Sequence, residues 1–125
     1  MKTVVQTDNA PKAVGPYSQA IVMNGFLFVS GQIPIDPQSG EVSGSDVSSQ
    51  AELVIRNLLA IIEAAGADAQ NIVKCTCFLA SMDDFATFNQ VYEKHFGDIA
   101  PARECVAVKT LPKNVLVEIS AICGV

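Results

Sequence analysis

The sequence has no tryptophan, a single histidine (His95) and no cluster of lysine and arginine residues. One histidine and four cysteines, at spacings that match no zinc pattern, argue against a metal site and against a cysteine–histidine nucleophile. The net charge is −5, whereas proteins that bind nucleic acid need a basic patch to displace counterions from phosphates. We therefore expect no metal site, and the composition disfavours a nucleic-acid partner.

Long apolar runs are also lacking. The N-terminus becomes polar within a few residues, and no later stretch is apolar enough to serve as a signal peptide or a membrane span. Half of the 125 residues are hydrophobic and 17% are charged, which is typical of a compact globular chain. The sequence therefore predicts one domain over residues 1–125, in a soluble, cytoplasmic protein with no membrane partner.

The spacing of apolar residues predicts an α+β protein. Strands are expected over residues 2–7, 17–23, 26–30, 72–80, 101–108 and 115–122, and helices over about 46–65 and 84–96. Asn24-Gly25 predicts a tight hairpin. Each helix has one apolar face, and in the second helix that face is the aromatic stripe of Phe85, Phe88, Tyr92 and Phe96. Both helices should therefore pack on one side of the sheet.

The other side of such a sheet would be bare, although its strands carry apolar residues on both faces. A bare apolar sheet face implies association with copies of the same chain. Clefts between the copies would be natural ligand sites.

The last two strands, 101–108 and 115–122, carry charge among apolar neighbours. They are expected to form an antiparallel hairpin through the polar turn 109–114. If Val108 faces Val115, Cys105 falls opposite Glu118, and Arg103 shares the face of Cys105. This register would bring guanidinium, thiol and carboxylate together, whereas a slip of one residue would separate them.

Two interpretations of these charges remain open. Arg103 and Glu118 could form a structural ion pair. Alternatively, Arg103 could bind a carboxylate with its planar fork of donors, while a partly desolvated Glu118 deprotonates a water. Cys105 could likewise be a small buried hydrophobe or part of a pocket lining.

Five motifs, in this order along the chain, resemble one family. They are Gly15-Pro16-Tyr17-Ser18-Gln19-Ala20, Ser30-Gly31-Gln32-Ile33-Pro34, Asp84-Phe85-Ala86-Thr87-Phe88-Asn89, Pro101-Ala102-Arg103-Glu104-Cys105-Val106, and Leu111-Pro112-Lys113 through Glu118-Ile119. The sequence is similar almost end to end to the Rid family, also called YjgF or L-PSP proteins, and most similar to its RidA-type enamine/imine deaminases.

The resemblance implies a chorismate-mutase-like α+β fold, with a mixed sheet, two helices on one face, and a homotrimer with sites between subunits. It also implies hydrolysis, without a cofactor, of reactive 2-enamines and 2-imines such as 2-aminoacrylate. These compounds arise when serine or threonine is dehydrated, and the products are 2-keto acids and ammonia.

The resemblance also assigns site residues. Arg103 matches the carboxylate-binding arginine and Glu118 the water-activating glutamate of the family. The positions that match substrate-binding residues are Tyr17, Ser30, Gly31, Asn89 and Cys105. Cys105 is expected to line the site rather than to act as a nucleophile.

The sequence departs from the family pattern at two positions. Glu104 follows the arginine where a small residue is usual, and Ser120 replaces an acidic residue common two positions after the glutamate. By strand alternation Glu104 should point away from Arg103 and affect a subunit interface more than the chemistry.

Two other functions are weighed against the deaminase. A trimeric, non-catalytic sensor or chaperone-like module that binds 2-keto acids would use Arg103 but has no catalytic need for Glu118. An endoribonuclease that inhibits translation, as described for some relatives, is disfavoured by the acidic composition.

Overall fold

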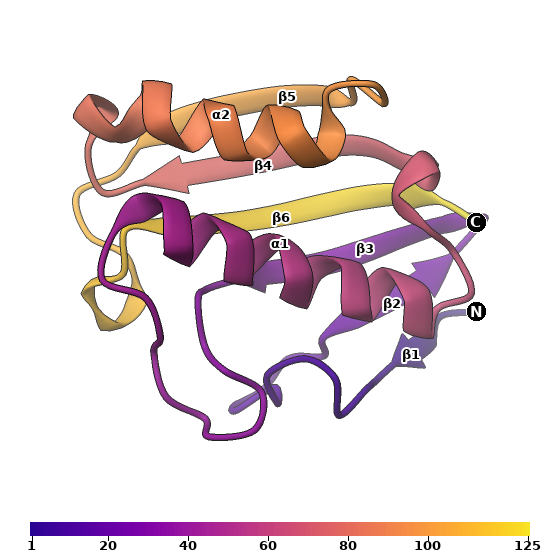
Figure 1. The fold of residues 1–125 in the computed structure, drawn as a ribbon. Helices are drawn as coiled ribbons and strands as arrows, with labels where there is room; N and C mark the ends of the chain where they lie inside the picture. The colour runs from indigo at the N-terminus through magenta and orange to yellow at the C-terminus, as the bar shows by residue number, and fades with distance from the viewer.

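The computed structural model describes all residues from 1 to 125 and contains one six-stranded mixed sheet in the order β1-β2-β3-β6-β4-β5. The strands are β1 (Thr3–Val5), β2 (Ala20–Met23), β3 (Phe26–Gln32), β4 (Ile72–Leu79), β5 (Ala102–Ala107) and β6 (Val117–Gly124). The helices are α1 (Val47–Ala64) and α2 (Phe85–Phe96), with short 3-10 turns at Ala69–Asn71, Met82–Asp84 and Pro112–Asn114. Both helices cover the same side of the sheet, as Figure 1 shows, which confirms the expected α+β fold class.

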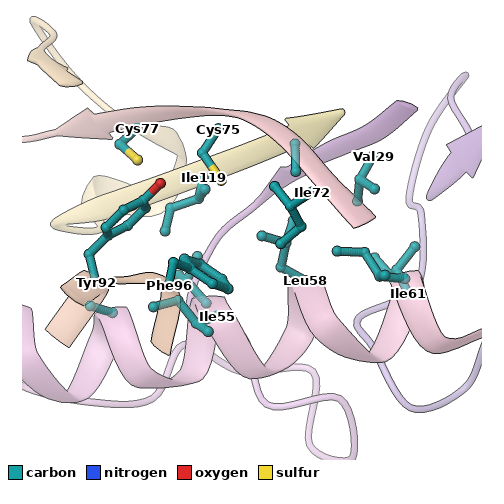
Figure 2. Close-up of a cluster of buried hydrophobic side chains, with 14 of the residues drawn as sticks. Val29, Ile55, Leu58, Ile61, Ile72, Cys75, Cys77, Tyr92, Phe96 and Ile119 are labelled. Carbon is teal, nitrogen blue, oxygen red and sulfur yellow. The ribbon is translucent and has the colours of Figure 1, made fainter. Parts of the chain in front are cut away.

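Helix α1 begins where the sequence pattern predicts. The Asp46 side chain accepts a hydrogen bond from the backbone N–H of Ser49, which satisfies a donor that the first turn leaves unpaired. The helix then buries a continuous apolar face against the sheet (Figure 2). The fully buried residues of this face are Ala51, Val54, Ile55, Leu58, Ile61 and Ile62.

The aromatic stripe of α2 completes this core. Phe88, Tyr92 and Phe96 are buried, and the rings of Tyr92 and Phe96 meet edge to face with their centroids 5.1 Å apart. From the sheet, Cys75 and Cys77 of β4 point into the same core. The interpretation of this stripe as core is therefore confirmed for its three buried rings.

The prediction that the last two strands form a hairpin is wrong. Strand β5 pairs in parallel with β4, whereas β6 lies antiparallel between β3 and β4. The cause is the β4–α2–β5 crossover, which returns the chain beside β4 in the parallel direction. The segment after β5 then passes the end of β4, where Val108 N–H donates to the Leu79 carbonyl at 3.0 Å, and enters the sheet on the far side of β4.

The sheet face opposite the helices is open in the single chain. Its large exposed side chains include Val4, Met23, Phe26, Phe28 and Val106, each more than 40% exposed. The expected bare apolar face is thus present. Neither helix is both long and apolar enough to cross a membrane.

Candidate active site

Arg103 lies on the edge strand β5, on the face that the helices cover, directly beside Cys75 of β4. Its Nη1 donates to Asn89 Oδ1 of α2 at 2.8 Å, and its guanidinium carbon lies 4.6 Å from the ring centroid of Tyr92 and 5.7 Å from that of Phe85. The ion pairs of the chain all involve other cations. The guanidinium of Arg103 is therefore fixed by these contacts, and no carboxylate of its own chain neutralises its charge.

Cys105 shares this face with Arg103, two residues further along β5, and neighbours Cys77 of β4. Burial raises the pKa of the Cys105 thiol, and the nearby Arg103 charge opposes that shift only in part. The thiol therefore stays protonated at neutral pH, which favours a lining role over a nucleophilic one. Arg103, Asn89 and Cys105 together form what we call the arginine half-site.

Glu118 of β6 is half-buried and faces Gly31 of β3 across the open side of the sheet. A Cβ atom added at Gly31 would collide with Glu118 Oε2 and would lie 3.0 Å from its Cδ, so only glycine leaves room for this carboxyl group. Burial raises the pKa of the Glu118 carboxyl above its ordinary value, and no protein group donates a hydrogen bond to it. Glu118 thus has the environment of a general base.

A small pocket of about 160 Å³ opens beside this carboxylate. Its lining comprises Pro11, Lys12, Tyr17, Gln19, Gly31, Gln32, Ile33, Ile35, Pro112 and Glu118. A larger hollow of about 680 Å³ shares six of these residues and adds Lys113 at its edge. Ser30 lies beside Tyr17 in a neighbouring hollow. Tyr17, Ser30, Gly31 and Glu118 form what we call the glutamate half-site.

A buried glutamine that we did not predict holds the loop of this half-site. Gln19 is 4% exposed, and its Nε2 donates to the carbonyls of Thr7 and Pro11 at 3.1 and 2.8 Å. The backbone carbonyl of Gln19 accepts a hydrogen bond from the Ser30 N–H at 2.9 Å. Gln19 thereby ties the loop carrying Tyr17 to strand β3. The signal available in the sequence was a glutamine directly before the apolar run that begins at Ala20.

Ser30 has a fixed proton. Its hydroxyl donates to the Ser18 carbonyl at 2.6 Å, so its lone pairs remain free to accept a hydrogen bond. A shift in strand register between Val29 and Gln32 falls at this point, as in a β-bulge. Such irregularities re-aim side chains next to functional sites.

The two half-sites lie on opposite faces of the sheet. Across β4, Cys105 lies in line with Cys77 and Ile119, whereas Glu118 lies in line with Phe78 and Val106. Neighbouring residues in such a row share one face, and Ile119 points into the core. The prediction that Arg103, Cys105 and Glu118 share a face is therefore wrong. The inserted strand β4 produces the one-residue offset that separates them.

Glu104 points away from Arg103, as strand alternation predicts. Its carboxylate accepts a hydrogen bond from Thr76 Oγ1 at 2.6 Å and pairs with Lys74 Nζ at 3.3 Å. The bond from Thr76, followed by that from Lys74, lowers the pKa of Glu104. Its charge is therefore paired on the open sheet face, away from the arginine half-site.

Similar proteins place the chain in a family. The sequence profile of the family described as "Endoribonuclease L-PSP" matches residues 7–125. The chain belongs to this family. A RutC family protein of Pyrococcus horikoshii is 52% identical over 122 residues, covering 98% of this chain and 97% of that protein.

Two Escherichia coli members of the L-PSP family add structural information. The "Putative reactive intermediate deaminase TdcF" is 45% identical over 125 residues, covering 98% of this chain and 96% of TdcF. A crystal structure of TdcF with bound serine matches with a TM-score of 0.93 at 43% identity, covering 98% of each chain. The YjgF gene product matches with a TM-score of 0.93 at 44% identity, also over 98% of each chain. The fold is therefore that of the YjgF/L-PSP proteins.

Proposed function

We propose that this protein hydrolyses 2-imines, including those formed from 2-enamines such as 2-aminoacrylate, to 2-keto acids and ammonia without a cofactor. The observation that carries the proposal is the desolvated carboxyl group of Glu118, which has a raised pKa and no protein partner and lies in a small pocket beside Gly31. Membership of the L-PSP family and the similarity to the reactive intermediate deaminase TdcF support the same reaction class.

The complete site would form between two copies of the chain. Arg103 and Glu118 lie on opposite sheet faces, so one chain does not present both to one small substrate. We propose that the arginine half-site of one copy meets the glutamate half-site of another in a homotrimer. The bare apolar sheet face gives such copies a surface to bury.

Arg103 would bind the carboxylate of the imino acid. Asn89 occupies one donor of its guanidinium, and no carboxylate of the chain competes for the others. A planar fork of N–H groups binds a carboxylate through two parallel hydrogen bonds. Fixing the carboxylate orients the neighbouring imine carbon and turns the attack of water into an ordered step.

Glu118 would activate that water. The water donates one hydrogen bond to Glu118, which takes that proton during attack, and a second hydrogen bond to the free lone pair of Ser30, while Tyr17 lines the approach. Attack forms the C–O bond, and Glu118 passes the first proton of the water to the nitrogen, which gives a carbinolamine. Glu118 then takes the proton of the new hydroxyl group and passes it to the nitrogen, so that the carbonyl forms as the C–N bond breaks and ammonia leaves. Imine and water thus give a 2-keto acid and ammonia, with no change in oxidation state that would require a redox partner.

Mixing two inactive variants tests both the residues and the shared site. Arg103→Ala and Glu118→Gln should each abolish the acceleration of ammonia release from an amino-acid-oxidase mixture. Co-expressed and purified through two tags, they should regain activity in about a third of the sites, because each mixed trimer has one site that combines the intact Arg103 of one variant with the intact Glu118 of the other. Co-expressing Arg103→Ala with the double variant is the matched control and should regain none.

Other outcomes would reject parts of the proposal. Activity retained by Arg103→Ala would reject the role of the arginine. A mixture that stays inactive, with mixed oligomers present, would place both residues of each site in one copy. Stoichiometric binding of 2-oxobutanoate without any turnover by the wild-type protein would favour the 2-keto-acid sensor. The homotrimer and the cytoplasmic location stay predictions.

A further inference from the structure

Helix α2 presents three side chains to the guanidinium of Arg103. Phe85, Asn89 and Tyr92 stand four and three residues apart, which places them on one face of a helix. Asn89 accepts the hydrogen bond from Nη1, and the two rings lie at 4.6 Å for Tyr92 and 5.7 Å for Phe85. Both ring distances are within the range of cation–π contacts.

This support differs from an ion pair in one respect that matters for binding. A carboxylate partner would fill two donors of the guanidinium and cancel its charge. An aromatic face attracts the cation through its quadrupole but accepts none of the in-plane N–H bonds. The rings can therefore fix the guanidinium while leaving its charge and its outer N–H groups free for an anion.

The hydroxyl group of Tyr92 has no part in this contact. Tyr92 is 7% exposed, and its hydroxyl, the one buried side-chain polar atom of the chain without a hydrogen-bond partner, is directed toward β4, beside Cys75 (Figure 2). Burial raises the pKa of this phenol far above its ordinary value, so the side chain stays neutral. The ring is the part of Tyr92 that Arg103 touches.

We infer that Tyr92, assisted by Phe85, is a positioning residue that holds Arg103 in the orientation that binds the carboxylate of 2-imino and 2-keto acids. This inference rests on the proposed function. Since a lysine ammonium has no planar fork to stack and align, the same geometry requires arginine at position 103.

Core packing and positioning predict different results in one set of variants. Tyr92→Leu removes the ring, Tyr92→Phe keeps the ring without the hydroxyl, and Phe96→Leu removes a fully buried ring of the same helix that does not contact Arg103. For each variant we would measure the Tm, the Kd for 2-oxobutanoate by calorimetry, and kcat and KM for imine hydrolysis.

We expect Tyr92→Leu to weaken 2-oxobutanoate binding and to raise KM by about tenfold, in line with a partly desolvated cation–π contact. Tyr92→Phe should bind as the wild type does. Phe96→Leu should lower the Tm to a similar degree as Tyr92→Leu and leave both the Kd and KM unchanged. Equal Kd values for Tyr92→Leu and Phe96→Leu would overturn the inference.

Two further variants keep the test decisive. If Tyr92→Leu fails to fold, the half-buried Phe85 decides instead: Phe85→Leu should weaken binding by about threefold, with Phe85→Tyr as its ring-preserving control. Arg103→Ala separates this inference from the proposed function. Loss of 2-oxobutanoate binding in Arg103→Ala but not in the ring variants rejects the positioning role alone. Normal binding and turnover in Arg103→Ala rejects the proposed function.

Discussion

Replacing Gly31 by alanine should separate the chemistry of the glutamate half-site from the stability of the fold. The backbone of Gly31 is not left-handed, so alanine fits its conformation, and the added methyl group acts only through what it touches. It would collide with Oε2 of Glu118 and crowd its Cδ and Cγ, at 3.0 and 3.3 Å. Carbon atoms pack at about 3.5–4.0 Å. The carboxyl group must therefore move by about 1 Å or more.

The expected magnitudes differ for activity and stability. A misplacement of about 1 Å costs on the order of 100-fold in rate, or about 2.7 kcal/mol in the barrier. Forcing Glu118 off its rotamer costs about 0.5–1.5 kcal/mol of stability. Alanine recovers about 0.4–1 kcal/mol by restricting the unfolded chain. The free energy of unfolding should thus change by less than about 1 kcal/mol.

The assay for Gly31→Ala is the initial rate of ammonia release, with urea unfolding measured in parallel. Gly124→Ala is the control, because a Cβ at this strand position meets nothing within 4 Å of its own chain. A second change, Glu118→Asp, shortens the side chain and should recover part of the rate lost in Gly31→Ala. Wild-type turnover in Gly31→Ala would refute the claim that Glu118 must occupy this position.

Four further predictions concern titration, charge and helix capping. The pKa of Glu118 is higher in the folded than in the unfolded chain, so this carboxyl group contributes stability at low pH that is lost as pH rises through the folded pKa. Glu118→Gln should therefore have a higher Tm than the wild type at neutral pH. An equal or lower Tm would contradict the burial argument. For the same reason, kcat/KM should rise with pH along an acid limb shifted above that of an ordinary glutamate, and a limb at the ordinary position would exclude Glu118 as the base. Arg103→Lys should lose most 2-oxobutanoate binding despite keeping the charge, which calorimetry would show, and tight binding would mean that charge alone suffices. Asp46→Ala removes the cap of α1 and should lower the free energy of unfolding by about 1 kcal/mol while leaving turnover unchanged, as urea unfolding and the ammonia assay would report.

Local signals in the sequence predicted the helices and the turn between β2 and β3. The bounds of α1 follow from a cap at Asp46 and a regular apolar face. The residues Asn24 and Gly25 both adopt positive φ, as a tight hairpin requires. The second strand was expected from residue 17 but begins at Ala20, because the buried Gln19 holds the preceding segment as a loop.

Pairing between distant strands was beyond the reach of the local pattern. The alternation within β5 and within β6 was predicted correctly, since Glu104 points away from Arg103 and Glu118 away from the core. The prediction that β5 and β6 are neighbours was wrong, because β4 lies between them. Strand β4 comes from earlier in the chain, and its place beside β5 follows from the crossover through α2. The contact between Tyr92 and Arg103 was missed for a related reason. The same helical spacing marks a ring that fills the core and a ring that also supports a cation.

The strand between the two half-sites makes the proposed chemistry a property of the assembly. A folded monomer would hold every reacting group and still lack a working centre, so specific activity should fall on dilution even while the fold persists. A substitution on the open sheet face, for instance at Phe26 at the opposite end of β3 from Ser30 and Gly31, would then silence hydrolysis without touching any residue near the substrate.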